Sequence, residues 1–162
     1  MKRIVLILLM LVNLFSLNAQ ENELFKDREY PQWFSDAKLG IFIHYGLYSV
    51  PSYSDKEQYA EWFYKGLISN DSLRIDFQKK VFGENFEYRD YKDLFKAELF
   101  DAVEWADLFA KSGAKYILFT SKHHDGYCMW DSEYAKGRSS ATTTPKRDFC
   151  AELADEVRKR GV

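Results

Sequence analysis

The chain has 162 residues, of which 17% are aromatic and 30% charged, and its formal net charge is −2. No stretch rich in Lys and Arg is present that could neutralise a phosphate backbone, so nucleic-acid binding is not expected. This composition is typical of a globular protein and favours a neutral ligand.

The first twenty residues have the pattern of a secretory signal peptide. Two basic residues precede an uninterrupted apolar run over residues 4–12, and a small-residue site follows at Ala19. We expect cleavage after Ala19, which makes residues 1–19 the signal peptide and residues 20–162 an exported chain, periplasmic or secreted. A transmembrane anchor is the alternative, but the apolar run is shorter than roughly 20 residues. No stable membrane anchor is therefore expected.

Two short apolar runs, rich in β-branched and aromatic residues, predict β-strands over residues 39–43 and 116–120. Each run ends in a polar turn that bears glycine. All three histidines of the chain follow these ends: His44 after the first run, His123 and His124 after the second. Parallel strands flanked by helices present their carboxyl ends to the ligand, so we expect the histidines to share one face.

The segment between these strands begins with a loop and a predicted helix over residues 57–65. Ser54 or Asp55 is expected to cap this helix, and Gly66 to end it. The following stretch, residues 72–86, has no pattern that assigns it to one structure.

A second helix is clearer and covers residues 102–111. Asp101 occupies the capping position, Glu104 has the capping-box spacing, and Gly113 is placed to terminate the helix. The apolar positions between them suit a helix packed on a sheet.

A long loop over residues 125–145 leads to a third predicted helix, residues 147–160, which Asp148 helps to start and Gly161 ends. Such an alternation predicts another strand next, where the sequence stops at Val162. A closed (β/α)₈ barrel takes roughly 200 to more than 400 residues. We therefore expect an α/β fragment with exposed apolar surface and poor solubility.

Glu61 and Trp62 combine a carboxylate with an indole, a pair that sugar recognition uses. The carboxylate forms charge-assisted hydrogen bonds with hydroxyls, and the indole offers an apolar face to C–H groups. From the residues alone, however, a surface Glu beside a core Trp is the favoured interpretation, because an aromatic residue on an amphipathic helix usually packs inward.

The adjacent histidines are more informative. Neutral imidazoles offer donors and acceptors that could bind vicinal hydroxyls. A metal site is less favoured, because the spacing does not put two ligands on one face and neighbours at a strand end point to opposite sides. A structural His pair is a further alternative. Asp125 could act as an acid, but Asp-Gly is first of all a turn.

The sequence has two cysteines, Cys128 and Cys150. They could pair in an exported protein, but two thiols do not make a disulfide framework. Unpaired thiols are the favoured interpretation.

Five segments resemble, in the same order, motifs of the α-L-fucosidases of glycoside hydrolase family 29: residues 39–51, 61–62, 122–127, 130–132 and 146–148. The resemblance runs from about Trp33 to Val162. It implies the N-terminal portion of a (β/α)₈ TIM-like barrel, with about two βα units and the start of a third. In the family, a β-sandwich domain usually follows the barrel. The implied reaction is hydrolysis of terminal α-L-fucose with retention at the anomeric carbon, on a fucosylated glycan or fucoside, with no cofactor and no metal.

By position, five residues match those that hold the fucose hydroxyls and ring in the family: His44, Glu61, Trp62, His123 and His124. None of them is the nucleophile. The family's catalytic Asp and its acid/base carboxylate come later in the sequence, so the resemblance implies that both would fall beyond Val162 and that this chain has no catalytic residue.

Three aromatic residues depart from the family's usual choice: Tyr45 for Trp, Phe63 for Tyr and Tyr127 for Phe. Each replacement keeps an aromatic ring, so fucose binding is still expected. The preferred linkage and aglycone are not decided by these residues. A fucose-binding lectin-like module and an inactive truncated product are the alternative interpretations, and hydrolysis by the isolated chain is not expected. The sequence does not decide the oligomeric state.

Overall fold

The computed structural model describes residues 29–162, and the predicted signal peptide lies outside them. The chain divides into two units, Met1–Asp36 and Ala37–Val162. Helix α2 (Gln32–Ala37) reaches the boundary between them. All of the predicted site residues belong to the second unit. None of the helices in the described part of the chain is both long enough and apolar enough to cross a membrane.

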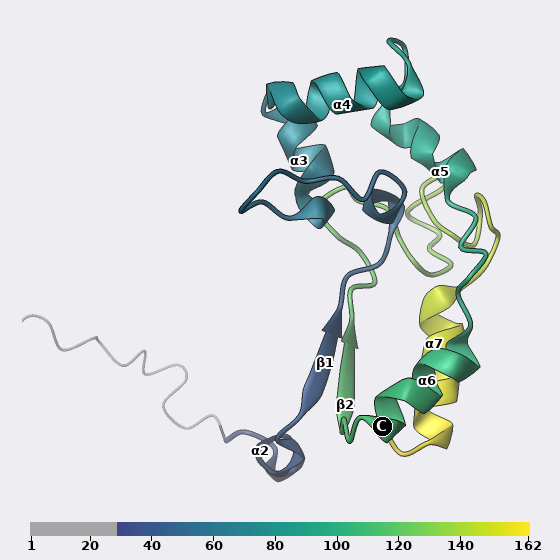
Figure 1. The fold of residues 1–162 in the computed structure, drawn as a ribbon. Coiled ribbons are helices and arrows are strands. Elements are labelled where there is room, and N and C mark those ends of the chain that lie inside the picture. The colour runs from purple at the N-terminus through teal and green to yellow at the C-terminus, as the bar shows by residue number, and fades with distance from the viewer. Residues whose placement is uncertain (1–28) are drawn as a thin grey trace, which may run out of the picture. The chain divides into compact units, whose positions relative to one another are not determined.

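Two parallel strands, β1 (Gly40–Ile43) and β2 (Tyr116–Phe119), form the sheet of the second unit (Figure 1). Both predicted strands are confirmed. Gly40 lies opposite Tyr116, and a Cβ atom at Gly40 would fall 2.1 Å from the Tyr116 ring, so the glycine makes room for that ring on the neighbouring strand. The pairing puts the two carboxyl ends at the same edge.

Helices α6 (Ala102–Lys111) and α7 (Phe149–Lys159) pack on each other beside this sheet (Figure 1). The predicted caps are confirmed. The Asp101 carboxylate accepts the backbone N–H groups of the first turn of α6, and the Asp148 carboxylate accepts the backbone N–H of Ala151, at 2.8 Å. Both helices therefore begin where the sequence places an acceptor for otherwise unpaired N–H groups.

Between β1 and α6 the chain forms, in order, η2 (Leu47–Ser49), η3 (Ala60–Trp62), α3 (Phe63–Ile68), α4 (Ser72–Phe82), η4 (Tyr88–Asp90) and α5 (Tyr91–Leu94). The helices α3, α4 and α5 lie beyond the carboxyl ends of the strands (Figure 1). The stretch that the sequence left unassigned thus contains α4. Asp71 caps this helix by accepting the N–H groups of Leu73 and Arg74.

The prediction of a helix over residues 57–65 is wrong in its start and its end. Ser54 and Asp55 do not cap a helix. The Ser54 hydroxyl instead donates to the carbonyl of Gln58, at 3.1 Å, and closes a loop. The helical segment begins later, with η3, and runs through Gly66 in the middle of α3. A close neighbour of Gly66, described below, explains why glycine is found inside a helix.

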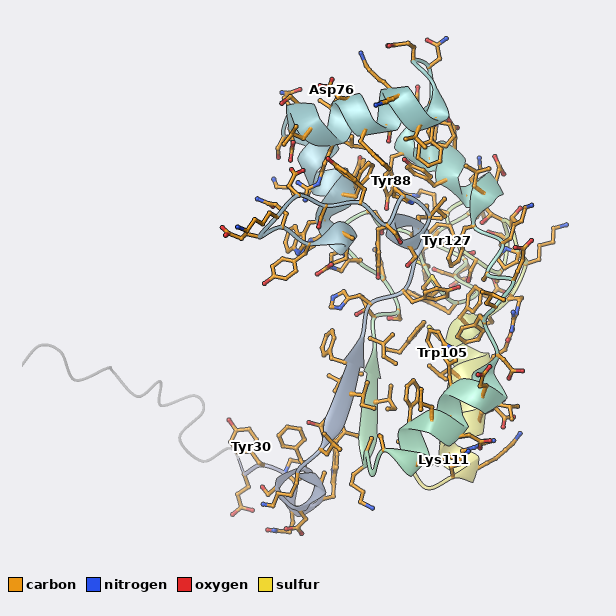
Figure 2. All side chains as sticks on the ribbon, in the orientation of Figure 1. Tyr30, Asp76, Tyr88, Trp105, Lys111 and Tyr127 are labelled. Carbon is orange, nitrogen blue, oxygen red and sulfur yellow. The ribbon has the colours of Figure 1, made fainter. Side chains whose placement is uncertain are left out.

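A single hydrophobic core, rich in aromatic residues, connects the sheet with α6 and α7 and with the helices beyond the carboxyl ends of the strands. Ile41 and Ile117 contact this core from the sheet. The buried Tyr127 and the partly buried Trp105 of α6, both labelled in Figure 2, also belong to it. On the opposite face of the sheet, Phe42 is exposed. The parallel strands and packed helices agree with the predicted α/β class, while the assignment to the N-terminal portion of an incomplete (β/α)₈ barrel stays a prediction.

The two cysteines are not bonded to each other, in agreement with the favoured interpretation. Cys128 is buried and Cys150 is partly buried. Burial, with smaller contributions from Asp148 and Cys128, raises the pKa of the Cys150 thiol to about 12. Cys150 is therefore a protonated packing residue at neutral pH.

Candidate functional site

His44 and His123 meet at the carboxyl edge of the sheet. Their ring centroids are 5.1 Å apart and their planes are inclined at 77°. The backbone N–H of Thr120 donates to the carbonyl of Ile43, at 3.0 Å, and so extends the strand pairing to the start of both polar turns. The expectation that these histidines share one face is confirmed.

His123 and His124 stand on a tight turn. The backbone N–H of Gly126 donates to the carbonyl of His123, at 3.0 Å, and Gly126 has φ of +76°, a value that glycine adopts without strain. The two imidazole centroids are only 4.7 Å apart. The expectation that neighbouring side chains point to opposite sides is therefore wrong here. Strand pairing ends at Phe119, so strand alternation does not extend to the turn.

Trp62, the last residue of η3, packs against both His123 and His124. Its ring lies 4.2 Å from that of His124, tilted by 34°, and 5.7 Å from that of His123, edge-on. Trp62 is 37% exposed, whereas the next residue, Phe63, is fully buried. The interpretation of Trp62 as a core residue is wrong, because Phe63 fills the core and leaves the indole at the surface beside the histidines.

Glu61 is partly buried and precedes Trp62 in η3. Burial lowers the pKa of His123, and the Glu61 charge is a smaller, opposing contribution. The structure thus brings His44, His123, His124 and Trp62 into one ring cluster, with Glu61 in electrostatic range. Their predicted role in holding a sugar is not tested by this arrangement and stays a prediction.

The surroundings of His123 favour its neutral form. Burial lowers its pKa below 6.5, the neighbouring His124 and His44 lower it further, and Asp125 and Glu61 act in the opposite direction. The imidazole is therefore neutral at pH 7 and presents one donor and one acceptor nitrogen. Its Nδ1 atom is buried and has no hydrogen-bond partner in the described part of the chain.

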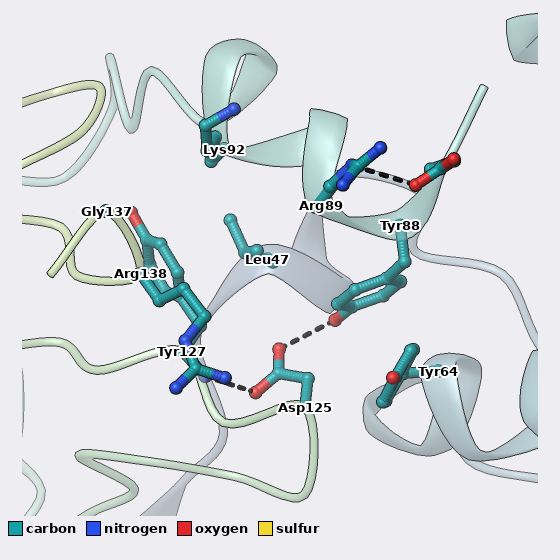
Figure 3. A pocket seen from close by; sticks show the side chains of 10 residues that line it. Leu47, Tyr64, Tyr88, Arg89, Lys92, Asp125, Tyr127, Gly137 and Arg138 are labelled. Carbon is teal, nitrogen blue, oxygen red and sulfur yellow. Dashed lines mark hydrogen bonds and ion pairs between the residues drawn. The ribbon is translucent and has the colours of Figure 1, made fainter. Parts of the chain in front are cut away.

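Asp125 is held in place below the histidine turn. Its Oδ2 atom accepts the hydroxyl of Tyr88 at 2.7 Å, and its Oδ1 atom accepts the backbone N–H of Tyr127 at 3.1 Å. Figure 3 shows the Tyr88 hydroxyl directed at this carboxylate, in a pocket of about 260 Å³. Burial and Asp125 together raise the pKa of Tyr88, so Tyr88 remains a donor. The turn interpretation of Asp125 is confirmed.

Tyr88 and Tyr48 are two site neighbours that sequence reasoning did not single out. Tyr88 follows the stretch without a clear pattern, and no sequence signal links it to Asp125. Tyr48 is buried in η2, and its ring lies 5.4 Å from that of His123. Tyr48 lies within residues 39–51, one of the segments that resemble the fucosidases. That resemblance is the sequence signal by which Tyr48 could have been found.

Among residues 29–162, no three His, Cys, Asp or Glu side chains are grouped in a way that could hold a metal ion.

A family model described as alpha-L-fucosidase matches residues 15–162. The chain belongs to the α-L-fucosidase family. The match begins before the first described residue and includes every motif named above.

Relatives within the α-L-fucosidase family come from distant organisms. The chain is 44% identical to alpha-L-fucosidase of Dictyostelium discoideum over 138 residues, which is 83% of this chain and 30% of that protein. It is 42% identical to human plasma alpha-L-fucosidase over 134 residues, or 82% of this chain and 28% of the human protein. The chain thus spans less than a third of the length of these fucosidases.

Solved fucosidase structures share the fold of the described part. The crystal structure of Thermotoga maritima alpha-fucosidase in complex with a mechanism-based inhibitor matches with a TM-score of 0.78 and 46% identity. The match covers 82% of this chain and 32% of the Thermotoga chain. A family 29 alpha-L-fucosidase from Bacteroides thetaiotaomicron matches with a TM-score of 0.66 and 34% identity, over 83% of this chain and 28% of that one.

Proposed function

We propose that this chain forms the fucose-holding part of an α-L-fucosidase, a retaining exo-glycosidase that hydrolyses terminal α-L-fucose from glycans. The observation that carries the proposal is the cluster of His44, His123, His124 and Trp62 at the carboxyl edge of the parallel strands. Membership of the fucosidase family supports the substrate.

The cluster has the chemistry that a deoxy sugar requires. The imidazole of His123 is neutral near pH 7, and because its Nδ1 atom is buried, its Nε2 atom is the one that can form a hydrogen bond with a sugar hydroxyl. The exposed face of Trp62 can pack on the C–H groups of the ring and its methyl group, and the Glu61 carboxylate can accept a hydroxyl in a charge-assisted bond. These contacts position the sugar and strengthen as the oxocarbenium-like transition state forms.

The reaction needs two further carboxyl groups. In a retaining glycosidase, these groups lie about 5–5.5 Å apart: one attacks the anomeric carbon, and the other protonates the leaving oxygen and then activates water. Asp125 is a poor candidate for either role, because both of its oxygens accept hydrogen bonds. From the resemblance to the fucosidases, in which both catalytic carboxyl groups come later in the sequence than the motifs matched here, we propose that neither the nucleophile nor the acid/base is among residues 29–162.

Calorimetric titration of the purified chain with L-fucose tests whether the ring cluster binds the sugar. D-fucose, its mirror image, is the control. We expect binding of the L sugar alone, weakened about tenfold or more by His124→Ala or Trp62→Ala, which corresponds to the loss of one good polar or stacking contact. Glu133→Gln alters an exposed carboxylate elsewhere and should leave binding unchanged. Absence of L-fucose binding would contradict the proposal.

A fucose-binding module without hydrolysis is the second candidate, because the described part contains the ring cluster, while the neighbouring Asp125 carboxylate accepts hydrogen bonds from Tyr88 and Tyr127. Incubation with an aryl α-L-fucoside tests for reaction, and we expect no release of fucose above a blank. Release would show that the chain itself contains the reacting groups. Sequencing of the gene beyond codon 162 separates the two candidates, since an open frame leading to an Asp at a later strand end supports the enzyme.

We infer further that the chain is exported, from the signal-peptide pattern of residues 1–19. N-terminal sequencing of the protein recovered from the periplasm or medium should begin at Gln20. Recovery in the cytoplasm with Met1 intact would contradict export.

A further inference from the structure

Beside the ring cluster lies a second hollow, a groove of about 440 Å³ between the loop before η3, helix α3 and the start of α4. Trp62 belongs to the wall of this groove and to the ring cluster at once. Trp62 is thus the residue through which the ring cluster and the groove adjoin.

Two aromatic side chains stand open at this groove. Tyr59 is 67% exposed and Trp62 is 37% exposed, although both are large apolar groups that folding would otherwise bury. The backbone of Tyr59 is nevertheless fixed, because its carbonyl accepts the N–H of Trp62 at 3.1 Å and the Nη2 atom of Arg74 at 3.4 Å. The ring is thus presented at the surface from an anchored position.

The polar part of the groove is built around a buried charge. Arg74 is only 4% exposed, and its Nη1 atom forms an ion pair with the Asp71 carboxylate at 2.7 Å. Its Nε atom is buried and has no partner within the described residues. A Cβ atom at Gly66 would lie 2.2 Å from Cδ of Arg74. Glycine is therefore needed at this position of α3, because the Arg74 side chain packs directly against its backbone.

The charges around the groove balance. Lys65 and Arg74 are opposed by Glu57 and Asp71. A groove of this kind gives no advantage to an anion or a cation. Aromatic surfaces beside planar polar groups instead suit a neutral pyranose, whose C–H face packs on a ring while its hydroxyls meet Gln58 and the partly exposed Asp71 carboxylate.

We propose that this groove is the subsite for the neutral sugar residue to which the fucose is attached, with Tyr59 as a specificity-determining contact. This inference rests on the proposed function, since it takes the ring cluster as the fucose site. Trp62 then contacts both sugars, and the groove selects among fucosylated glycans by the residue next to the fucose.

The test compares two kinds of ligand on the full 162-residue chain. One is methyl α-L-fucoside, and the other is a set of disaccharides in which fucose is α-linked to galactose or to N-acetylglucosamine. We expect one of the disaccharides to bind about 3- to 10-fold more tightly than the methyl fucoside, the range that one ring contact provides. Tyr59→Ala should remove this gain and leave the dissociation constant of the methyl fucoside within about twofold.

Two controls keep the experiment specific. Tyr59→Phe retains the ring and should retain the gain. Tyr134→Ala removes a tyrosine that is 89% exposed on another loop and should change neither dissociation constant.

Three results would overturn the subsite. In the first, no disaccharide binds more tightly than the methyl fucoside. In the second, a disaccharide still binds more tightly than the methyl fucoside after Tyr59→Ala. In the third, Tyr59→Ala weakens the binding of the disaccharide and of the methyl fucoside equally. Failure of the proposed function looks different, because the methyl fucoside itself would then not bind to the unmodified chain. The subsite would be rejected with it.

Discussion

The hydroxyl of Tyr88 donates a 2.7 Å hydrogen bond to Asp125, although 37 positions separate the two residues in the sequence. Asp125 also accepts the N–H of Tyr127 and so closes the turn that carries the adjacent histidines. A single residue of η4 thereby braces the turn at the candidate site from outside it. The strength of that brace can be measured.

Tyr88→Phe removes the hydroxyl and retains the ring. We expect the free energy of unfolding in urea to fall by about 1.5–3 kcal/mol, the usual contribution of a hydrogen bond to a charged group. L-fucose binding should weaken as well, because the histidine turn loses its support. Tyr64→Phe is the matched control, since the Tyr64 ring packs 4.7 Å from that of Tyr88 but is not bonded to Asp125. Equal effects of the two variants would argue against the brace.

The lowered pKa of His123 predicts that stability depends on pH. Burial, His124 and His44 favour its neutral form in the folded chain, against Asp125 and Glu61. The unfolded chain then binds a proton at higher pH than the folded chain does, so stability rises with pH in this window. The contribution is fully present above about pH 6.5 and is lost as pH falls from there through the folded pKa.

Urea unfolding at pH 8.0 and at pH 5.5 measures this dependence. We expect lower stability at pH 5.5 and a smaller difference between the two pH values in His123→Gln, which cannot titrate. A pH dependence unchanged by that substitution would assign the effect to other groups.

Gly66→Ala should destabilise the chain although alanine is the better helix former. The new methyl group would meet the stem of Arg74, and overpacking of this kind costs about 1–3 kcal/mol. The same substitution in an Arg74→Ala background should cost much less, because the clashing atoms are gone. The difference between the two costs, measured by urea unfolding, is the coupling energy. A coupling energy near zero would mean that Gly66 is required for another reason.

Arg147→Lys should destabilise the junction between α6 and α7. The Arg147 guanidinium donates from Nε to Glu152 at 3.1 Å and from Nη1 to the Phe100 carbonyl at 3.2 Å, and it lies 5.1 Å from the Phe100 ring centroid. Lysine keeps the charge but cannot reproduce this planar arrangement, so we expect a loss of about 1–2 kcal/mol in thermal or urea unfolding. Arg158→Lys, at an exposed position of α7, should have no effect of that size.

Local patterns were sufficient for much of the framework. Apolar runs located both strands, and the carboxylates Asp101 and Asp148 located the starts of α6 and α7. These features depend on neighbours within a few residues, which is the range over which hydrophobic alternation and capping act. The predicted end of the helix at Gly66 is wrong because Arg74, from the next helix, occupies the space that a side chain at this position would need, so glycine is found there without ending the helix.

The sequence by itself determined which residues are proposed to bind the sugar: three histidines at strand ends and Glu61 beside Trp62, within the motifs shared with the fucosidases. Only the tertiary structure decided how these side chains are arranged. It left Trp62 at the surface by burying Phe63, drew the rings of His123 and His124 together, and joined Tyr88 to Asp125. The physical reason is that these contacts depend on packing between segments far apart in the chain, and no local pattern of residues encodes such packing.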